Sequence, residues 1–332
     1  MLNMFRAAPR VSVAGIARAI LLAAPALAAS VAQAQSFPAK PVHLVVAFAP
    51  GGPADIIARL ISQRLGEALG QPVLVENRAG AGGVVAAQQI ARGPADGYTV
   101  LVTTTAFAVG PSLAKAPGYD IEKDFAPVSL IASQPSVIVA YPGLNLNTLQ
   151  EVLAAAKTGK LNFGTAGTGT TPHLAAEYLF KVLAKVDVTH IPYNGGGPAL
   201  QAVVGGNVEL VNVALSPAIP LIKAGKLRGI AVTGAKRSEA PPSIPTVAES
   251  GFPGFEDYTW VAALAPAGTP PETVNRLSEE IDKLLKTPEF RERLANVAFD
   301  PVGGTPAKFA QSLRADAARL SKFVRETGLK IE

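Results

Sequence analysis

The chain has 332 residues, of which 30 are lysine or arginine and 25 are aspartate or glutamate, so its formal net charge is +5. This length is sufficient for two lobes, each with its own hydrophobic core. The absence of cysteine excludes a disulfide framework, a thiol nucleophile and a cysteine metal site. The basic residues form no long run, which argues against nucleic acid or a membrane surface as a partner.

The first 34 residues have the pattern of a secretory signal peptide. Three arginines lie before or beside the apolar stretch Ala19–Ala29, and small residues of the cleavage-site type end at Ala34. The apolar stretch is too short for a comfortable bilayer anchor. We therefore expect export to the periplasm with cleavage near Ala34, which removes three positive charges and leaves 27 basic and 25 acidic groups, a net charge of +2.

The mature chain begins with a predicted strand, glycine turn and helix. The apolar run Val42–Phe48 is typical of a strand buried in a parallel sheet. The turn Pro50–Gly52 follows, Pro53 suits the first helical position, and Gly70 ends the helix. Asp55 in the first turn complements the helix dipole. The free backbone N–H groups at this helix start predict an anion site at the carboxyl end of the strand.

Strands and helices continue to alternate along the chain, as in an α/β protein. Phe125–Tyr141 is predicted to be extended chain that crosses from one lobe to the other. The further predicted strands are Val73–Val75, Tyr98–Thr103, Leu161–Phe163, Val186–Ile191, Val208–Val213 and Leu227–Thr233. The helices between them are predicted to start near Gly83, Thr148, Pro172, Pro198 and Ala218.

Three helices are predicted to close the chain. Thr269 and Glu272 have the spacing of a capping box for a helix that begins at Pro270. Thr287 and Thr305, each followed by proline, mark the starts of the other two helices. Four aromatic residues before these helices are expected to pack between the lobes: Phe252, Phe255, Tyr258 and Trp260.

The segment Phe163–His173 is a second candidate anion loop. Its glycines allow the backbone to approach a ligand closely, and its threonines offer hydroxyl donors. The same residues are also compatible with a simple connection in which Thr171 caps the next helix. The segment lacks the lysine of a phosphate-binding loop. The residues concerned are Gly164, Thr165, Gly167, Thr168, Gly169, Thr170 and Thr171.

A third loop, Ile191–Leu200, again joins a strand end to glycines and a helix. Tyr193 can stack on a ligand or donate its hydroxyl, or it can fill the core with its hydroxyl at the surface. We favour the ligand role, because Gly195–Gly197 beside it would serve little purpose in packing.

The sequence offers little for catalysis. His43, His173 and His190 are the three histidines, and none has the spacing of a paired metal motif. No nucleophile-elbow motif occurs. His173 lies in the first turn after the second loop, where ligand contact and a structural role are both open. A secreted hydrolase would pair His173 with a threonine hydroxyl, and it would need an orienting carboxylate that no nearby sequence feature announces.

With these loops identified, the whole mature chain resembles the Bug-type solute receptors, the extracytoplasmic components of tripartite tricarboxylate transporters. No single motif is decisive, whereas the ordered set is specific. The motifs are FAPGGPADIIAR, VENRAGAGG, PADGYTVL, FAPVSLIA, LNFGTAGTGTTPHLAAE, IPYNGGGPAL, IKAGKLRGIAVT, IPTVAESGFPGFEDYTW and APAGTPPETV.

The resemblance implies a type II periplasmic-binding fold, in which two α/β lobes joined by hinge strands close over a small carboxylate. It places lobe 1 at residues 35–136 and 235–332 and lobe 2 at 137–234. Asn194 departs from the lysine and Val213 from the aspartate that are common in the family at these positions. The loss of that aspartate favours a plain or aromatic carboxylate over an amino acid. The residues assigned to ligand binding are Phe48, Ala49, Pro50, Gly51, Gly52, Asp55, Thr104, Thr105, Thr165, Gly167, Thr168, Tyr193 and Gly197.

The implied function is a periplasmic receptor, not an enzyme, that delivers a di-, tri- or aromatic carboxylate to integral membrane transporter subunits. We assign no catalytic residue, metal or cofactor, and we expect a monomer. An ABC-type receptor of the same fold is the first alternative, and a secreted hydrolase is the second.

Overall fold

The computed structural model describes residues 37–113, 118–159, 161–239 and 241–327. The predicted signal peptide, residues 1–34, lies outside the described residues. The fold described below belongs to the unit that starts at Lys40. Its strands follow the order β2-β1-β3-β9-β4-β7-β5-β6, with β8 and β10 also paired to β4. This is an α/β fold, as expected.

The first lobe is built around three parallel strands. β1 (Val42–Val46) pairs in parallel with β2 (Val73–Asn77) and β3 (Thr99–Thr104). β9 (Tyr258–Pro266) runs antiparallel between β3 and β4 (Phe125–Ala140), and β10 (Asp300–Pro301) pairs with β4. The helices of this lobe are α2 (Pro53–Leu69), α3 (Val84–Ala91), α4 (Ala106–Leu113), α9 (Pro271–Lys286), α10 (Pro288–Asn296) and α11 (Pro306–Thr327).

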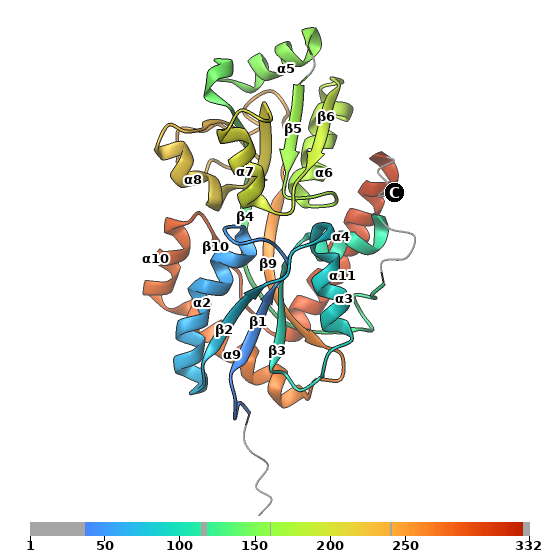
Figure 1. Ribbon diagram of the computed structural model, residues 1–332, viewed down its shortest axis with the longest axis vertical. Coiled ribbons are helices and arrows are strands. Elements are labelled where there is room, and N and C mark those ends of the chain that lie inside the picture. The colour runs from blue at the N-terminus through green and yellow to red at the C-terminus, as the bar shows by residue number, and fades with distance from the viewer. Residues whose placement is uncertain (1–36, 114–117, 160, 240, 328–332) are drawn as a thin grey trace, which may run out of the picture. The chain divides into compact units, whose positions relative to one another are not determined.

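The second lobe repeats the alternation of strands and helices (Figure 1). β5 (Leu161–Thr165) pairs in parallel with β6 (Val188–Pro192) and β7 (Leu210–Ala214), and β8 (Arg228–Val232) pairs with β4. The helices are α5 (Leu149–Thr158), α6 (Thr171–Glu177), which continues as a π-helix over Tyr178–Leu183, α7 (Gly196–Val204) and α8 (Leu215–Lys223).

β4 connects the two lobes, as predicted for the extended segment Phe125–Tyr141. Its residues 125–135 pair with β9, and its residues 136–140 pair with β7 and β8. Where the chain returns, the Thr233 hydroxyl donates to the carbonyl oxygen of Asp257 at 2.8 Å, and the Asp257 N–H donates to Thr233 O at 2.9 Å. The same hydroxyl accepts from the Ser136 N–H at 2.8 Å. These bonds tie the outgoing and returning segments together and form the hinge.

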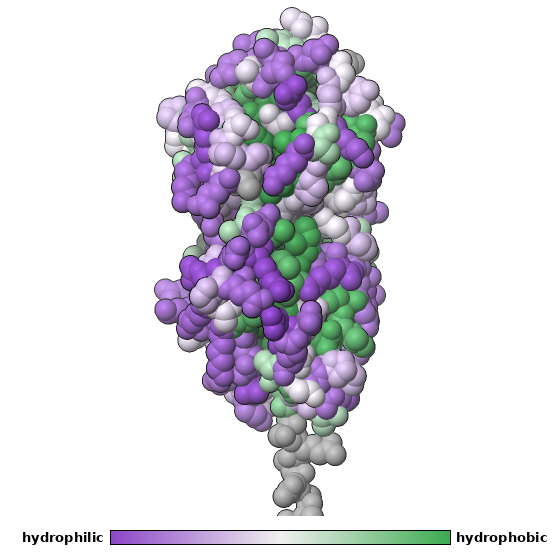
Figure 2. Space-filling model, turned by 90° about the vertical axis from the view of Figure 1, so that its left-hand side faces the viewer, coloured by the Kyte–Doolittle hydropathy of each residue, from purple (hydrophilic) through white to green (hydrophobic). Residues whose placement is uncertain are grey.

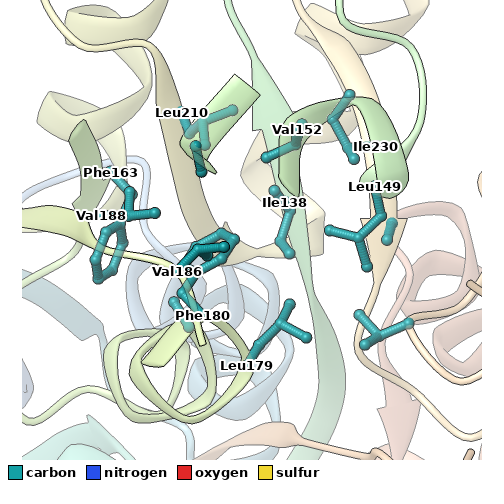
Figure 3. Packing of buried hydrophobic residues seen from close by; sticks show 14 of the residues in the cluster. Ile138, Leu149, Val152, Phe163, Leu179, Phe180, Val186, Val188, Leu210 and Ile230 are labelled. Atoms are coloured by element: carbon teal, nitrogen blue, oxygen red, sulfur yellow. The ribbon is translucent and has the colours of Figure 1, made fainter. Parts of the chain in front are cut away.

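Residues after position 234 still pack with the second lobe. Val247 and Phe255 are buried in a cluster with Ile138, Phe163 and other residues of β4–β7, part of which Figure 3 shows. The predicted lobe boundaries at 136 and 234 stay a prediction. The expectation that Trp260 packs between the lobes is wrong, because Trp260 packs edge-on against Phe309 of α11 in the first lobe.

Local sequence signals account for most of the helix boundaries. Pro53 begins α2, and Gly70 ends it in the left-handed conformation, with φ of +71°. Thr287 caps α10 as predicted, since its hydroxyl accepts from the Phe290 N–H. The predicted capping box at Thr269 is wrong: Pro270 is the N-cap of α9, and the Thr269 hydroxyl donates to Pro266 O.

Candidate functional site

A narrow cleft lies between the two lobes, with roughly 360 Å³ of space between its atoms, the mouth included. Its walls consist of apolar residues, glycine and threonine hydroxyls, and no charged side chain lines it. The lining residues are Phe48, Pro53 and Thr104 from the first lobe, Ala166, Thr170, Pro172, Gly196 and Ala214 from the second, and Thr259 from β9. Any charge recognition in this cleft must therefore come from the backbone and from hydroxyl groups.

Five helices begin at or next to this cleft. α2, α4, α6, α7 and α8 each follow the carboxyl end of a strand, and Pro53, Thr104, Thr170, Gly196 and Ala214 at or just before their starts line the cleft. The first N–H groups of a helix have no partner within the helix. The aligned peptide dipoles place roughly half a positive charge at each helix start. The cleft therefore attracts anions without a lysine or arginine.

The loop Phe48–Gly52 of the first lobe is held in place by Asp55. Its carboxylate accepts from the Gly51 N–H at 3.0 Å, from Arg59 Nε at 3.0 Å and from Asn77 Nδ2 at 2.9 Å. Asn77 Nδ2 also donates to the carbonyl oxygen of Phe48 at 3.0 Å. Although burial acts to raise the pKa of Asp55, the bonds from Arg59, Gly51 and Asn77 outweigh it and lower that pKa. Asp55 remains ionised and fixes the shape of the loop.

Neutral groups hold the loop Thr165–Thr170 of the second lobe. The Thr170 hydroxyl donates to Gly167 O at 2.8 Å, and the Gly167 N–H donates to the Thr165 hydroxyl at 3.3 Å. Gly167 and Gly169 have φ of +137° and +80°, which residues with a side chain rarely adopt. The glycines are therefore required by the turn itself.

Two stacked histidines lie behind this second loop. The rings of His173 and His190 are 3.9 Å apart, and His190 Nε2 lies 2.7 Å from the Thr165 hydroxyl. The Gly169 N–H donates to His173 Nδ1 at 3.1 Å, so the ring proton of neutral His173 is on Nε2. Burial lowers the pKa of His173 to about 3, with smaller contributions from His190 and Lys181. Burial likewise lowers the pKa of His190 to about 4.

His173 has a structural role in this arrangement. Its side chain is buried, its Nδ1 is used by the loop, and its Nε2 lies 3.8 Å from Glu177 Oε1. The Glu177 carboxylate itself pairs with Lys181 Nζ at 2.6 Å. A carboxylate does lie beside His173, but the histidine is not among the residues that line the cleft.

The two lobes approach each other closely at glycines. A Cβ at Gly197 would lie 2.8 Å from Pro50 O, and a Cβ at Gly195 would lie 3.2 Å from Ala49 Cβ. A Cβ at Gly82 would lie 2.8 Å from Thr168 O. Distances below 3.0 Å are too short for a carbon next to an oxygen. The lobes are therefore in a closed arrangement that side chains at Gly82 or Gly197 would obstruct.

The structure brings most of the predicted site residues to one region. Phe48 and Thr104 line the cleft, and Ala49, Pro50, Thr168 and Gly197 are at the contact between the lobes. Thr105 is buried beside the cleft and accepts from the Trp260 N–H at 2.9 Å. The ring of Tyr193 packs over Gly164 and Val211, since a Cβ at Gly164 would meet both.

Some site residues were missed, and Val213, one of the departures from the family, lies away from the cleft. Sequence reasoning passed over Ala214, Thr259 and the loop containing Gly82, although glycines 80–83 follow a strand in the same way as the other loops do. Val213 is fully buried in a hydrophobic cluster with Val137 and Leu215 and does not line the cleft. Alternation along β7 directs its neighbour Ala214 to the cleft instead. The ligand preference drawn from Val213 stays a prediction.

The outer surface differs from the cleft in character. Figure 2 shows the side of the molecule on which α2, α8 and α10 lie, where hydrophobic residues reach the surface in patches among hydrophilic ones. Among the described helices, none combines the length and the apolar character that a membrane crossing needs.

Comparisons with known proteins agree with this geometry. Residues 57–329 match the tripartite tricarboxylate transporter family receptor. BugT of Bordetella pertussis is 36% identical over 317 residues, which cover 94% of this chain and 97% of BugT. A solved R. palustris protein with adipate has a TM-score of 0.86 and 34% identity, covering 89% of this chain and 99% of that one.

A second R. palustris structure, MatC with bound malate, has a TM-score of 0.80 and 32% identity, covering 87% of this chain and all of MatC. These similarities confirm the two-lobed receptor fold and the expectation of a solute-binding protein, not an enzyme. The hydrolase alternative finds no support in them. The chain belongs to the tripartite tricarboxylate transporter receptor family, whose members are periplasmic solute receptors.

Proposed function

We propose that this protein captures a small carboxylate between its lobes in the periplasm and delivers it to the membrane subunits of a tripartite transporter. The observation that carries this proposal is the convergence of five helix starts on a cleft without charged side chains. Relatives solved with adipate and with malate support a carboxylate as the ligand class.

The apolar walls favour a short aliphatic dicarboxylate. Phe48, Pro53 and Pro172 offer apolar surface to a methylene chain, while the helix starts take the carboxylate oxygens. Hydrogen bonds to a charged group contribute roughly 1.5–3 kcal/mol each. A micromolar affinity corresponds to about −8 kcal/mol, so a few such bonds together with apolar burial suffice.

The proposed roles of the site residues follow from their contacts. The backbone of Phe48–Gly52 and of Thr165–Thr170 binds the carboxylate, and Asp55 acts by holding the first loop. The proposal includes signal-peptide cleavage near Ala34 and a monomeric receptor. N-terminal sequencing of the exported protein and its mass in solution test these two points.

Two substitutions of Gly52 test the cleft. Gly52 has φ of −85° and is the N-cap of α2, so aspartate there suits the helix while placing a negative charge at the anion site. We expect Gly52→Asp to leave the melting temperature unchanged or raised and to abolish binding of adipate and malate in calorimetry. The matched Gly52→Ala variant should bind normally, because its Cβ would meet atoms only at 3.7 Å or beyond. Unchanged affinity in Gly52→Asp would refute the site.

A further inference from the structure

A second cavity lies between the hinge and two helices, and it shares no lining residue with the cleft. Its volume is about 270 Å³. This is close to the lower end of the range of roughly 300–1,000 Å³ for small-molecule sites. The lining residues are Leu174, Ala175 and Tyr178 of the second lobe, Gly254, Phe255, Glu256 and Asp257 of the returning segment, and Arg319, Leu320 and Lys322 of α11.

Asp257 contributes a half-buried carboxylate to this cavity. Its Oδ2 accepts from the Ser136 hydroxyl at 3.4 Å, and no basic side chain of the described residues forms an ion pair with it. Arg319 instead pairs with Asp316 at 3.0 Å, and Asp316 also accepts from Trp260 Nε1 at 2.9 Å. Partial burial of the Asp257 carboxyl group raises its pKa to about 6. An ionised group in such a place is stabilised by a cation.

Aromatic rings complete the environment of a cation site. Tyr178 and Phe255 both line the cavity, and their rings are 6.4 Å apart with an interplanar angle of 22°. Aromatic faces attract ammonium groups through the ring quadrupole. Leu174 and Leu320 add apolar wall on either side. A carboxylate beside aromatic and aliphatic surface suits an ammonium group that carries a short apolar body.

The charged side chains around the cavity are of both signs. Above the pKa of Asp257, the lining residues Glu256 and Asp257 are negative and Arg319 and Lys322 are positive, and the Asp316 carboxylate outside the lining pairs with Arg319. The Arg319 side chain is 63% exposed and pairs with Asp316. Its charge lowers the pKa of Asp257, but burial of the Asp257 carboxyl group outweighs this effect.

We propose that this cavity is a second ligand site that binds a small organic ammonium ion, with its charge at Asp257 and its apolar body against Tyr178 and Phe255. The cavity walls come from both lobes and from the hinge. A cation that fits the cavity therefore stabilises the closed arrangement of the lobes. Resting on the proposed function, this coupling means that the cation and the carboxylate raise each other's affinity by the same factor.

Calorimetry of the mature protein with benzylammonium chloride at pH 8 tests the site. This probe lacks a carboxylate and therefore cannot use the anion cleft. We expect saturable binding by the wild type and at least tenfold weaker binding by Asp257→Asn. Benzyl alcohol, the neutral analogue, should bind at least tenfold more weakly to the wild type. Asp187→Asn, which makes the same change at an exposed position, should bind as the wild type does.

A second variant keeps the test independent of hinge damage. Tyr178→Leu leaves Asp257 in place and removes one ring, so we expect it to bind the cation at least threefold more weakly. Absence of saturable binding by the wild type would overturn the proposal, as would equal binding by Asp257→Asn or displacement of the cation by adipate. Failure of carboxylate binding itself would appear in a separate adipate titration and would leave the cation result readable.

Discussion

The two loops that face the cleft have the same backbone design and different supports. Each joins the end of a parallel strand to a proline-containing helix start through glycine. The first loop is held by the ionised Asp55 with Arg59 and Asn77. The second is held by threonine hydroxyls and two neutral histidines. The backbone groups that we propose to bind the ligand are thus separated from the side chains that set their geometry.

This difference has consequences for stability. The support of the first loop depends on the ionised carboxylate of Asp55. Because the pKa of Asp55 is lowered, acid neutralises this carboxylate only well below pH 7. The second depends on histidines that must stay neutral. We therefore expect mild acid to weaken the second loop before the first.

The largest effect is expected for Asp55→Ala. This change removes the acceptor of the Gly51 N–H and leaves Asn77 Nδ2 with one partner fewer. Hydrogen bonds to a charged group suggest a loss of about 2–3 kcal/mol in the free energy of unfolding. Adipate binding should also fall at least tenfold, because the loop loses its fixed shape. Urea unfolding and calorimetry measure the two effects.

Asp282→Ala is the matched control for that change. Asp282 likewise pairs with a helix lysine, Lys286, and accepts from a backbone N–H, that of Gly304. It does not line the cleft, so its loss should lower stability and leave affinity unchanged. If Asp55→Ala behaved in the same way, the first loop would not need its carboxylate support for binding.

An intermediate effect is expected from acid through His173. Its pKa is about 3 in the folded protein and 6.5 in the reference state, so below pH 6.5 the unfolded chain takes up a proton that the native state refuses. The contribution of neutral His173 to the free energy of unfolding is therefore fully present above pH 6.5 and is lost as the pH falls toward 3. Between pH 7 and pH 5 the loss should be about 2 kcal/mol.

His173→Asn isolates this contribution, because asparagine keeps an acceptor for Gly169 without a titrating ring. Urea unfolding at both pH values should show a smaller decrease in stability for the variant by about 2 kcal/mol. The pKa of Asp257 is shifted in the opposite direction, so the native state binds a proton at a higher pH than the unfolded chain does. This contribution is the same in the wild type and in His173→Asn. Equal pH dependence of both would show that His173 is not kept neutral by the fold.

The sequence predicts local structure well where one signal dominates. Pro53 begins α2 because its fixed φ suits a helix start, and Gly70 ends α2 because glycine readily adopts a left-handed φ. α4 was missed, since Gly110 and Pro111 are poor helix formers and the buried setting of the helix is tertiary. β9 was also missed as a strand, although it separates β3 from β4.

The site was predictable in outline because its loops follow strand ends. The sequence could not show which residues of one lobe lie against the glycines of the other lobe. Gly197 is predicted to contact the ligand, and in the structure it also allows the close approach of Pro50. The same limitation concealed Thr259, whose hydroxyl lies 2.6 Å from that of Thr171 across 88 residues of sequence.

The smallest effect is expected from a substitution at the contact between the two lobes. Gly197→Ala places a Cβ 2.8 Å from Pro50 O in the closed arrangement, so the lobes must stay slightly apart. We expect roughly tenfold weaker adipate binding, equivalent to about 1.4 kcal/mol, with an unchanged melting temperature of the ligand-free protein. Gly159→Ala adds the same methyl group where the nearest atom is 3.7 Å away and should bind normally. Equal affinities of the two variants, measured by calorimetry, would mean that binding does not require the contact of Gly197 with Pro50, and that each loop holds the carboxylate by itself.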